Sequence, residues 1–421
     1  MRISRIVARQ ILDSRGNPTV EADVMLDSGA FGRASVPAGA SVGTHEAREL
    51  RDKQSAYGGK SVSKAVRNIT KHMAPKLIGK LADDQFTIDD TLKLLDGTSN
   101  KSKLGANAIL AVSLAVAKAA ANDKNMPLYR HIAELAHNNS FCLPMPMFNI
   151  INGGKHAHGG LDFQEFMIVP RGIDDFARAL QAGAEIFHHL GDILAKIGSP
   201  TTVGDEGGYA PRVENNAKAL QLITEAIAAA GYNPGKDVSI AIDVAASEFY
   251  KNSTYHFPAE KHSYTSSKLI EYYSELCRRF PIMSIEDGLA EDDWAHWPKL
   301  NHALEQFALV VGDDLLATNP TLLQKAIHKQ AANTILIKPN QIGTLSETLQ
   351  TVHLAQTAGW HVIVSHRSGE TEDTTIAHMA VGLGVPYIKA GSLSRGERLA
   401  KYNELLRIGE TLATGHAICK L

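Results

Sequence analysis

Six short apolar runs in the second half of the chain each end in a charged or polar side chain, and this repeat limits the fold more than any other feature. The runs SIAID, PIMSIE, LVVGD, TILIK, VIVSH and YIK end at Asp243, Glu286, Asp313, Lys338, His366 and Lys389. Four of the five steps between these ends are about 25 residues long. One strand plus one helix has this length, so the spacing predicts a (β/α) barrel.

The residues at the run ends predict a shared site. A buried parallel strand is apolar along its length, so a charge at its last position emerges at the carboxyl edge of the sheet. We therefore expect the six terminal side chains to meet at one mouth of the barrel.

The first third of the chain shows a different pattern. Residues 3 to about 36 alternate apolar and polar in three runs, with turns at 14–18 and 27–29, which predicts a three-stranded antiparallel meander. Helical periodicity then covers residues 61–79, 85–95, 105–121 and 126–135. Strands followed by helices indicate a small α+β unit.

A change in composition marks the boundary between the two patterns. Residues 144–160 are rich in proline, glycine and histidine, which indicates a domain seam near residue 138 and an active-site loop. The predicted class is α/β, with an α+β capping domain at residues 1–137 and a (β/α)8-type catalytic barrel at residues 138–421.

Composition and charge exclude several functional classes. The chain has 421 residues, 44% of them hydrophobic, which is enough for two cores. Its net charge is −2 and no run of like charge occurs, so we expect a small ligand rather than nucleic acid or an anionic membrane. The longest apolar stretch, residues 108–121, is interrupted by Ser113 and Lys118, which favours a buried helix over a membrane span.

The cysteines and the amino terminus are the features that indicate the cellular compartment. Cys142, Cys277 and Cys419 are far apart and have no CxxC spacing, so we expect reduced thiols and no disulfide. The first residues alternate like a strand and lack the pattern of a signal peptide. We therefore predict a cytoplasmic location.

Asp243, Glu286 and Asp313 end three strands and so are expected to converge. Three carboxylates at one point repel one another, and an oxygen-only cluster with room for water and substrate suits Mg²⁺. Each acid alone is more simply explained as a cap of the following helix. For all three together we favour a metal site.

Lys338 and Lys389 end two later strands on the same rim, with His366 between them. Beside another ammonium group and Mg²⁺, the pKa of a lysine falls, and Lys338 becomes a usable general base. The alternative is that each lysine only pairs with the carboxylates. Two lysines facing a metal site favour an anionic ligand between them.

The sequence SHRSGETED places Arg367 and Ser368 directly after His366. A guanidinium fork and a hydroxyl group at a strand end suit a phosphate or carboxylate. A structural ion pair of Arg367 with Glu370 or Glu372 is the alternative.

Two glycine-rich segments, NGGKHAHGG and VGDEGGYAP, match no nucleotide-binding pattern and are predicted to be active-site loops. Glu206 lies in the second, and DFQEF offers Gln164 and Glu165 at another strand end. Two carboxylates held close together do not both ionise easily, so one can serve as a general acid. His156 is a candidate metal ligand, although a hydrogen bond within its loop is the more common role for such a histidine.

Taken together, these motifs resemble the enolases over essentially the whole chain. The strongest matches are SHRSGETEDT, KPNQIGTLSE, VGDEGG, NGGKHA, FQEFMI, SIEDG and GDDL, all in the family's order. The resemblance implies a carbon–oxygen lyase of glycolysis and gluconeogenesis that interconverts 2-phospho-D-glycerate and phosphoenolpyruvate with two Mg²⁺ per active site.

The resemblance also implies residue roles. Lys338 would remove the C2 proton, Glu206 coupled to Glu165 would protonate the departing C3 hydroxyl, and His366 would belong to the catalytic set. The substrate would be held by His156, Gln164, Arg367, Ser368 and Lys389. The first Mg²⁺ would be held by Asp243, Glu286 and Asp313, and the second by Ser41.

The loop that carries Ser41 departs from the family's PSGASTG, because this chain reads PAGASVG with Ala38 and Val42 in place of two hydroxyl residues. Since Ser41 is retained, we expect activity to survive, with changed loop closure or second-metal affinity.

Other functions are compatible with parts of this pattern. A racemase or cycloisomerase of the same superfamily is an alternative, but Arg367, Ser368 and Ser41 favour a phosphorylated substrate. By resemblance alone we expect a homodimer or higher homo-oligomer. The family also suggests, as alternatives, a secondary cell-surface or secreted pool, plasminogen binding or membership of an RNA-degrading assembly. No basic patch supports the last two.

Overall fold

The computed structural model describes residues 1–40, 43–53, 55–157 and 160–419. Its N-terminal part holds a three-stranded antiparallel sheet of β1 (Ile3–Leu12), β2 (Pro18–Leu26) and β3 (Phe31–Ser35). The predicted meander is therefore confirmed. Gly16 and Gly29 in its two turns have φ of 71° and 90°, a backbone conformation that glycine adopts without strain.

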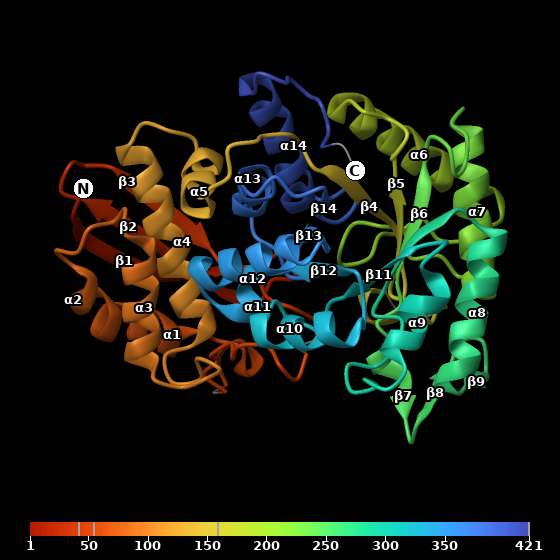
Figure 1. The fold of residues 1–421 in the computed structure, drawn as a ribbon, viewed down its shortest axis with the longest axis horizontal. Helices are drawn as coiled ribbons and strands as arrows, with labels where there is room; N and C mark the ends of the chain where they lie inside the picture. The colour runs from red at the N-terminus through yellow and green to blue at the C-terminus, as the bar shows by residue number, and fades with distance from the viewer. Residues whose placement is uncertain (41–42, 54, 158–159, 420–421) are drawn as a thin grey trace.

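Helices cover one face of this sheet (Figure 1). The helical elements of the N-terminal part are η1 (Ala56–Gly59), α1 (Ser63–Asn68), the π-turn η2 (Ile69–Met73), α2 (Ala74–Leu77), α3 (Gln85–Asp96), α4 (Ala106–Asp123) and α5 (Leu128–Ala136). The alanine-rich helix α4 is buried along most of its length. It approaches the sheet so closely that a Cβ at Gly32 would lie 2.2 Å from the Ala115 carbonyl oxygen.

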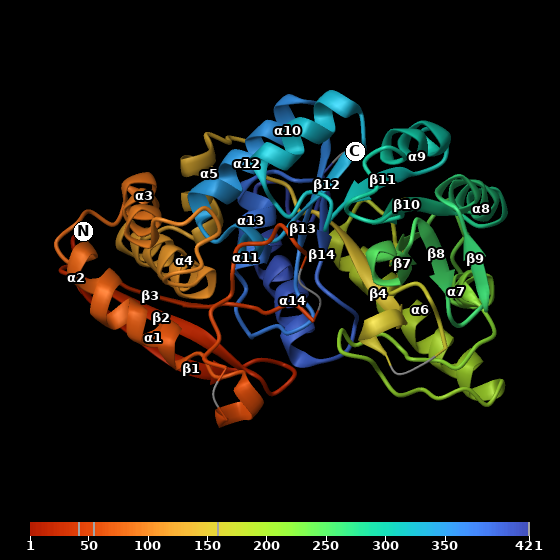
Figure 2. The same cartoon turned by 90° about the horizontal axis from the view of Figure 1, so that it is seen from below.

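The second part is a closed eight-strand barrel, which confirms the predicted fold class (Figures 1 and 2). Around the barrel the order is β10-β11-β12-β13-β14-β4-β5-β6. The strands are β4 (Met145–Asn152), β5 (Glu165–Val169), β6 (Ser239–Asp243), β10 (Ile282–Glu286), β11 (Leu309–Gly312), β12 (Thr334–Ile337), β13 (His361–Ser365) and β14 (Tyr387–Lys389).

Two features of the barrel differ from a simple strand–helix alternation. The stretch predicted to be a loop, residues 144–160, contains the fully buried strand β4, whose apolar run MPMFNIIN is flanked by loop-forming residues. Strand β5 runs antiparallel to both β4 and β6. Among the described residues between β4 and β5 the only helical element is the short 3-10 turn η3 (Gly154–His156), and a short connection of this kind joins antiparallel strands.

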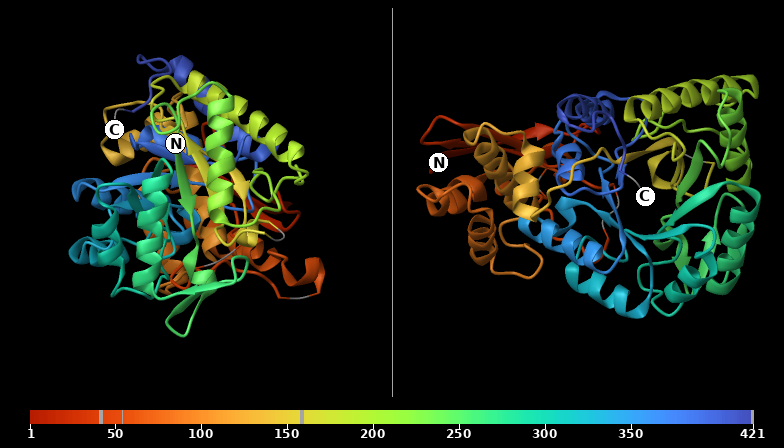
Figure 3. Two further views of the ribbon diagram at one scale, coloured as in Figure 1. Left: turned by 90° about the vertical axis from the view of Figure 1, so that its right-hand side faces the viewer. Right: turned by 45° about the horizontal axis from the view of Figure 1, so that its top comes forward.

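Helices surround the barrel, as the end view in Figure 3 shows. They are α6 (Phe176–Lys196), α7 (Asn216–Ala229), α8 (Ser266–Arg279), α9 (Trp297–Leu304), α10 (Pro320–Lys329), α11 (Pro339–Ile342), α12 (Leu345–Thr357), α13 (Thr375–Gly382) and α14 (Gly396–Thr411). After β6 come the 3-10 turn η4 (Ala246–Phe249) and a small sheet of β7 (Tyr250–Lys251), β8 (Thr254–Phe257) and β9 (His262–Tyr264), which the sequence did not predict. No helix within the described ranges is both long and apolar enough to cross a membrane.

The N-terminal part packs beside the barrel and reaches its mouth. Asp373, in the loop after β13, accepts hydrogen bonds from the Ser35 backbone N–H at 3.0 Å and from Lys118 Nζ at 2.7 Å. Ala38 and Gly369 exchange two backbone hydrogen bonds of 2.8 and 2.9 Å. The loop after β3 is therefore fixed to the rim of the barrel.

The prediction of three reduced cysteines is wrong for two of them. Cys142 and Cys419 form a disulfide, and Cys277 is free. The chain pairs Leu143 with Ile418 as adjacent extended segments, which brings the two cysteines together across a sequence separation of 277 residues. Sequence spacing alone does not show such a pairing.

Candidate active site

The strand-end residues lie together at the carboxyl mouth of the barrel. Asp243, Glu286 and Lys389 are the last residues of β6, β10 and β14. Glu286 is in register with Asp243 on one side and with Val311 of β11 on the other, and Asp313 follows two positions after Val311. Because alternate residues of a strand share a face, the three acids project from neighbouring strands toward the same mouth.

A small polar cavity lies at this mouth. Its free space is about 20 Å³, room for about one water molecule, because charged side chains fill it. Six of the lining residues are acids and three are lysine or arginine. The lining is His156, Gln164, Glu165, Glu206, Asp243, Ala245, Asp287, Asp313, Asp314, Lys338, Ser365, His366, Arg367, Ser368 and Lys389.

Lys389 is the centre of the carboxylate cluster. Its Nζ lies 2.9 Å from both carboxylate oxygens of Glu286 and 2.9 Å from Glu165 Oε2. It also lies 3.6 Å from Asp243 Oδ2. Burial lowers the pKa of Lys389, but Glu165, Glu286 and Asp243 raise it by more, so its pKa is well above the ordinary value. Lys389 is therefore held as an ammonium ion.

Lys338 forms an ion pair with Asp313, and Gln341 Nε2 donates to the other Asp313 oxygen at 2.9 Å. Burial lowers the pKa of Lys338, but the Asp313 carboxylate raises it by more, so the net direction is upward. The predicted lowering of this pKa refers to a site that holds Mg²⁺ and stays a prediction, because the upward direction here comes from the Asp313 carboxylate, which outweighs burial and the charges of Arg367 and Lys389.

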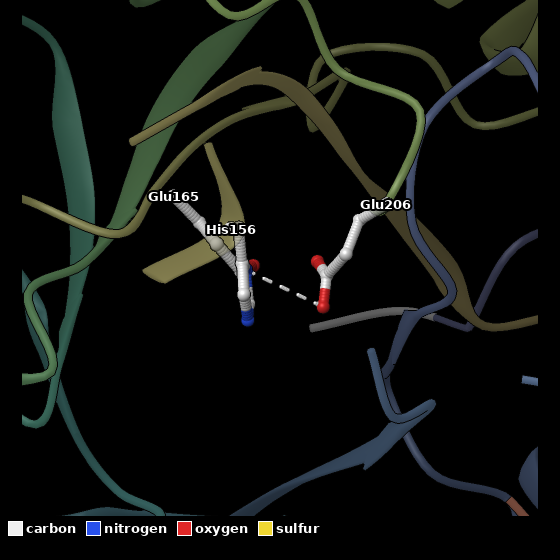
Figure 4. Close-up of side chains that lie close together, drawn as sticks. All are labelled: His156, Glu165 and Glu206. Carbon is white, nitrogen blue, oxygen red and sulfur yellow. Dashed lines mark ion pairs between the residues drawn. The ribbon is translucent and has the colours of Figure 1, made fainter. Parts of the chain in front are cut away.

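The two predicted acid groups flank His156 (Figure 4). His156 Nδ1 lies 3.5 Å from Glu165 Oε1 and 3.5 Å from Glu206 Oε1. Burial raises the pKa of Glu165, and repulsion from Glu206 raises it further, which favours a protonated carboxyl group in this pair. Asn149 Nδ2 donates to Glu206 Oε2 at 2.9 Å, and His366 Nε2 lies 3.4 Å from the same oxygen.

The mouth of the barrel holds more acidic than basic side chains. Burial raises the pKa of Asp243 and of Glu286, and repulsion from neighbouring acids adds to the effect, although Lys389 opposes it in both cases. Burial and Asp313 raise the pKa of Asp314 to about 8. Gln164 Nε2 supplies only one neutral hydrogen bond, to Asp243 Oδ2 at 3.2 Å. A divalent cation would remove this imbalance, and carboxylate oxygens are the ligands that Mg²⁺ prefers.

The structure also brings possible metal-binding atoms together in groups that were not predicted from the sequence. Among the described residues, the ligand atoms of Asp287, Asp313 and Asp314 lie within 4.8 Å of one another, as do those of His156, Glu165 and Glu206. The predicted set of Asp243, Glu286 and Asp313 is not such a group, and its carboxylates are instead paired with Lys389 and Lys338. Asp313 belongs to both sets. The donors fit a hard cation in either arrangement.

The residues of the predicted anion clamp, Arg367 and Ser368, also line the cavity. Arg367 pairs with Glu46 of the N-terminal part at 2.8 Å and donates to Asn340 Oδ1 at 3.1 Å. The alternative partner Glu370 instead pairs with Lys401 at 2.8 Å. Ser368 Oγ accepts from the Ala40 backbone N–H at 2.8 Å. Ser41 and Val42 lie outside the described residues.

Sequence reasoning missed several residues of the site. Asp287 and Asp314 follow predicted strand-end acids directly, and that adjacency was an available signal. Asn149 lies on the missed strand β4. Arg398, inside helix α14, contacts His366 and has no local sequence signal.

Comparison with known protein families agrees with the fold. The model described as "Enolase, N-terminal domain" matches residues 3–132. The model described as "Enolase, C-terminal TIM barrel domain" matches residues 140–418. Together the two matches cover most of the chain. The protein therefore belongs to the enolase family.

Proposed function

We propose that this protein catalyses the reversible dehydration of 2-phospho-D-glycerate to phosphoenolpyruvate and water. One observation carries the proposal. Lys338 and Lys389 face the same cavity as Glu206 and a cluster of buried acids, with Arg367 and Ser368 on the wall beside them. This set contains a base, an acid and an anion clamp at one place in an enolase-family barrel.

The proton at C2 is abstracted by Lys338. The amine has to be neutral to accept this proton, so its ion pair with Asp313 opens before the reaction. Lys389 stays an ammonium ion beside the Glu165 and Glu286 carboxylates, and it stabilises the negative charge that forms on the substrate. The two lysines therefore have different tasks because their partners differ.

The C3 hydroxyl leaves with a proton from Glu206. The raised pKa of the neighbouring Glu165 favours a protonated carboxyl group in this pair, which Glu206 shares through His156. Asn149 and His366 orient the Glu206 carboxyl group. Proton delivery by a positioned group contributes about 10²- to 10⁴-fold to a rate.

Substrate binding uses the remaining residues of the mouth. Arg367 and Ser368 hold the phosphate, and Gln164 and His156 contact the rest of the substrate. Asp243, Glu286 and Asp313 would hold one Mg²⁺ and Ser41, by family resemblance, a second, and the two ions would supply charge neutralisation to the bound substrate.

The test is the ultraviolet absorbance of phosphoenolpyruvate after 2-phosphoglycerate is added to the protein with Mg²⁺. We expect turnover in the wild-type protein and a loss of about 10³-fold in the folded Lys338→Ala variant. No signal at micromolar wild-type protein would reject the proposal. Epimerisation of a non-phosphorylated acid under the same conditions would favour the racemase alternative.

A further inference from the structure

Arg398 of helix α14 is fully buried at 0% exposure beside the proposed site. A guanidinium group has five N–H donors. Nη1 donates to the Arg367 carbonyl at 2.7 Å and to His366 Nδ1 at 2.5 Å. Nη2 donates to the carbonyls of Ser368 at 2.6 Å and Asp205 at 3.1 Å, and Nε donates to Glu397 Oε1 at 3.2 Å. Every donor thus has an acceptor.

The contact with His366 determines where the proton of its imidazole lies. Arginine has no acceptor and stays protonated in proteins, so Arg398 can only donate. His366 Nδ1 must then present a lone pair, and the neutral ring carries its proton on Nε2. Nε2 lies 3.4 Å from Glu206 Oε2. The N–H of His366 therefore faces the proposed acid.

The surroundings of His366 oppose a second proton on the ring. Burial lowers its pKa well below the ordinary value, and the charges of Arg398, Lys389 and Lys338 lower it further. His156 also lowers this pKa. Glu206 is the acid that faces the ring. The neutral form thus agrees with the tautomer that the hydrogen bond requires.

Arg398 also joins the two segments that carry the site. Its guanidinium group donates to the backbone carbonyls of Arg367 and Ser368 on one segment. On the other segment it donates to the backbone carbonyl of Asp205, which is next to Glu206. A Cβ at Gly391 would lie 2.6 Å from Arg398 Cδ and 2.9 Å from the Glu206 carbonyl oxygen, so the guanidinium group has little freedom to move.

We propose that Arg398 is a positioning residue that holds His366 as the neutral Nε2–H tautomer, so that His366 donates to Glu206 and does not act as a base there. The tautomer follows from the hydrogen bonds alone. Its importance for turnover rests on the proposed dehydration.

The test compares two replacements of Arg398. Lysine can only donate hydrogen bonds, whereas glutamine can both donate and accept them. Arg398→Lys keeps a donor toward Nδ1, whereas the amide of Arg398→Gln can also accept from a protonated Nδ1. Arg395→Gln is the matched control, because Arg395 donates to the Ser14 carbonyl at 2.8 Å and to Glu397 at 3.0 Å, with no bond to His366 among its contacts. His366→Gln identifies the signal to be followed.

The first measurement is the NMR spectrum of protein labelled with ¹⁵N-histidine, which does not depend on activity. In wild type, Arg398→Lys and Arg395→Gln we expect His366 to show a bare Nδ1 and a protonated Nε2. In Arg398→Gln we expect both tautomers, and protonation of the ring at a higher pH because one cation has gone. A protonated Nδ1 in the wild-type protein overturns the proposal, even if no variant folds.

The second measurement is the pH profile of kcat for dehydration. A doubly protonated His366 beside Glu206 keeps that carboxylate ionised, so Arg398→Gln should lose activity as the pH falls below neutrality, by about 10²-fold. Arg398→Lys should restore most of this loss. A decrease in Arg398→Gln that is equal at every pH, with an unchanged tautomer, would show a structural role only. If the wild-type protein does not dehydrate 2-phosphoglycerate, the NMR result still decides the tautomer.

Discussion

The mouth of the barrel and the joint between the two parts of the chain both bury charged groups, but they balance them differently. At the joint, Asp373 has partners for both oxygens, from Ser35, Lys118 and Thr375. Burial by itself would raise the pKa of Asp373, but Lys118 and Thr375 lower it to about 2. At the mouth, burial and repulsion raise the pKa of Asp243 and Glu286 instead.

This difference separates a structural from a functional use of the same residue types. A buried carboxylate with a full set of partners fixes two segments together. A cluster with surplus negative charge is costly for the folded protein by itself and gains by binding a cation. Changes at the joint should therefore reduce stability and spare activity, whereas changes at the mouth should do the reverse.

The largest effect is expected from Glu286→Gln. The amide keeps the size of the side chain but removes one charge from the surplus, so Mg²⁺-dependent turnover should fall by at least about 10³-fold. The melting temperature without Mg²⁺ should stay within a few degrees of the wild-type value. Normal turnover in this variant would contradict the metal assignment, and a circular dichroism spectrum controls for folding.

The reverse outcome is expected from Asp373→Asn. The neutral amide loses the ion pair with Lys118 and cannot accept from all of its present donors, so the free energy of unfolding should fall by about 3 kcal/mol. Turnover at 25 °C should stay within about twofold, because Asp373 lines no part of the active-site cavity. Urea unfolding measures the first quantity. A large fall in turnover with unchanged stability would remove the contrast between the two regions.

Binding of Mg²⁺ should also distinguish the mouth of the barrel from the joint. A ligand that binds only the folded state at 100 times its Kd stabilises that state by about 2.7 kcal/mol. We expect Mg²⁺ to raise the melting temperature of the wild type and of Asp373→Asn alike, and chelation to reverse the rise. Glu286→Gln should respond weakly. An equal rise in all three proteins would place the cation elsewhere.

The smallest effect is the acid dependence of stability at the joint. The folded pKa of Asp373, about 2, lies below the ordinary value, so its contribution is fully present above about pH 4 and is lost as the pH falls through 2. The contribution is about 2 kcal/mol. The difference in unfolding free energy between wild type and Asp373→Asn should thus shrink from pH 5 to pH 2. A difference that is constant over this range would show that Asp373 is not ionised in the folded protein.

The barrel was predictable because its strand ends repeat with one strand–helix period, and this placed Asp243, Glu286 and Lys389 correctly at one mouth. Strand β4 was missed because the prolines and glycines around its apolar run are typical of loops. In each case the local pattern decided the prediction.

Other features depend on contacts between distant segments. The Cys142–Cys419 disulfide and the contact of Arg398 with His366 join residues that no spacing rule connects. The upward shift of the Lys338 pKa depends on which neighbour is nearest, and the sequence gives only the set of neighbours.

The central claim is that the acids at the barrel mouth bind a divalent cation. Its most direct test is a crystal structure with phosphoenolpyruvate and with Mn²⁺ in place of Mg²⁺. We predict anomalous density at the barrel mouth, in contact with the carboxylates of Asp243, Glu286 and Asp313, with Lys338 released from Asp313. A mouth without anomalous density, with both lysines still paired to these acids under saturating Mn²⁺ and product, would contradict the account.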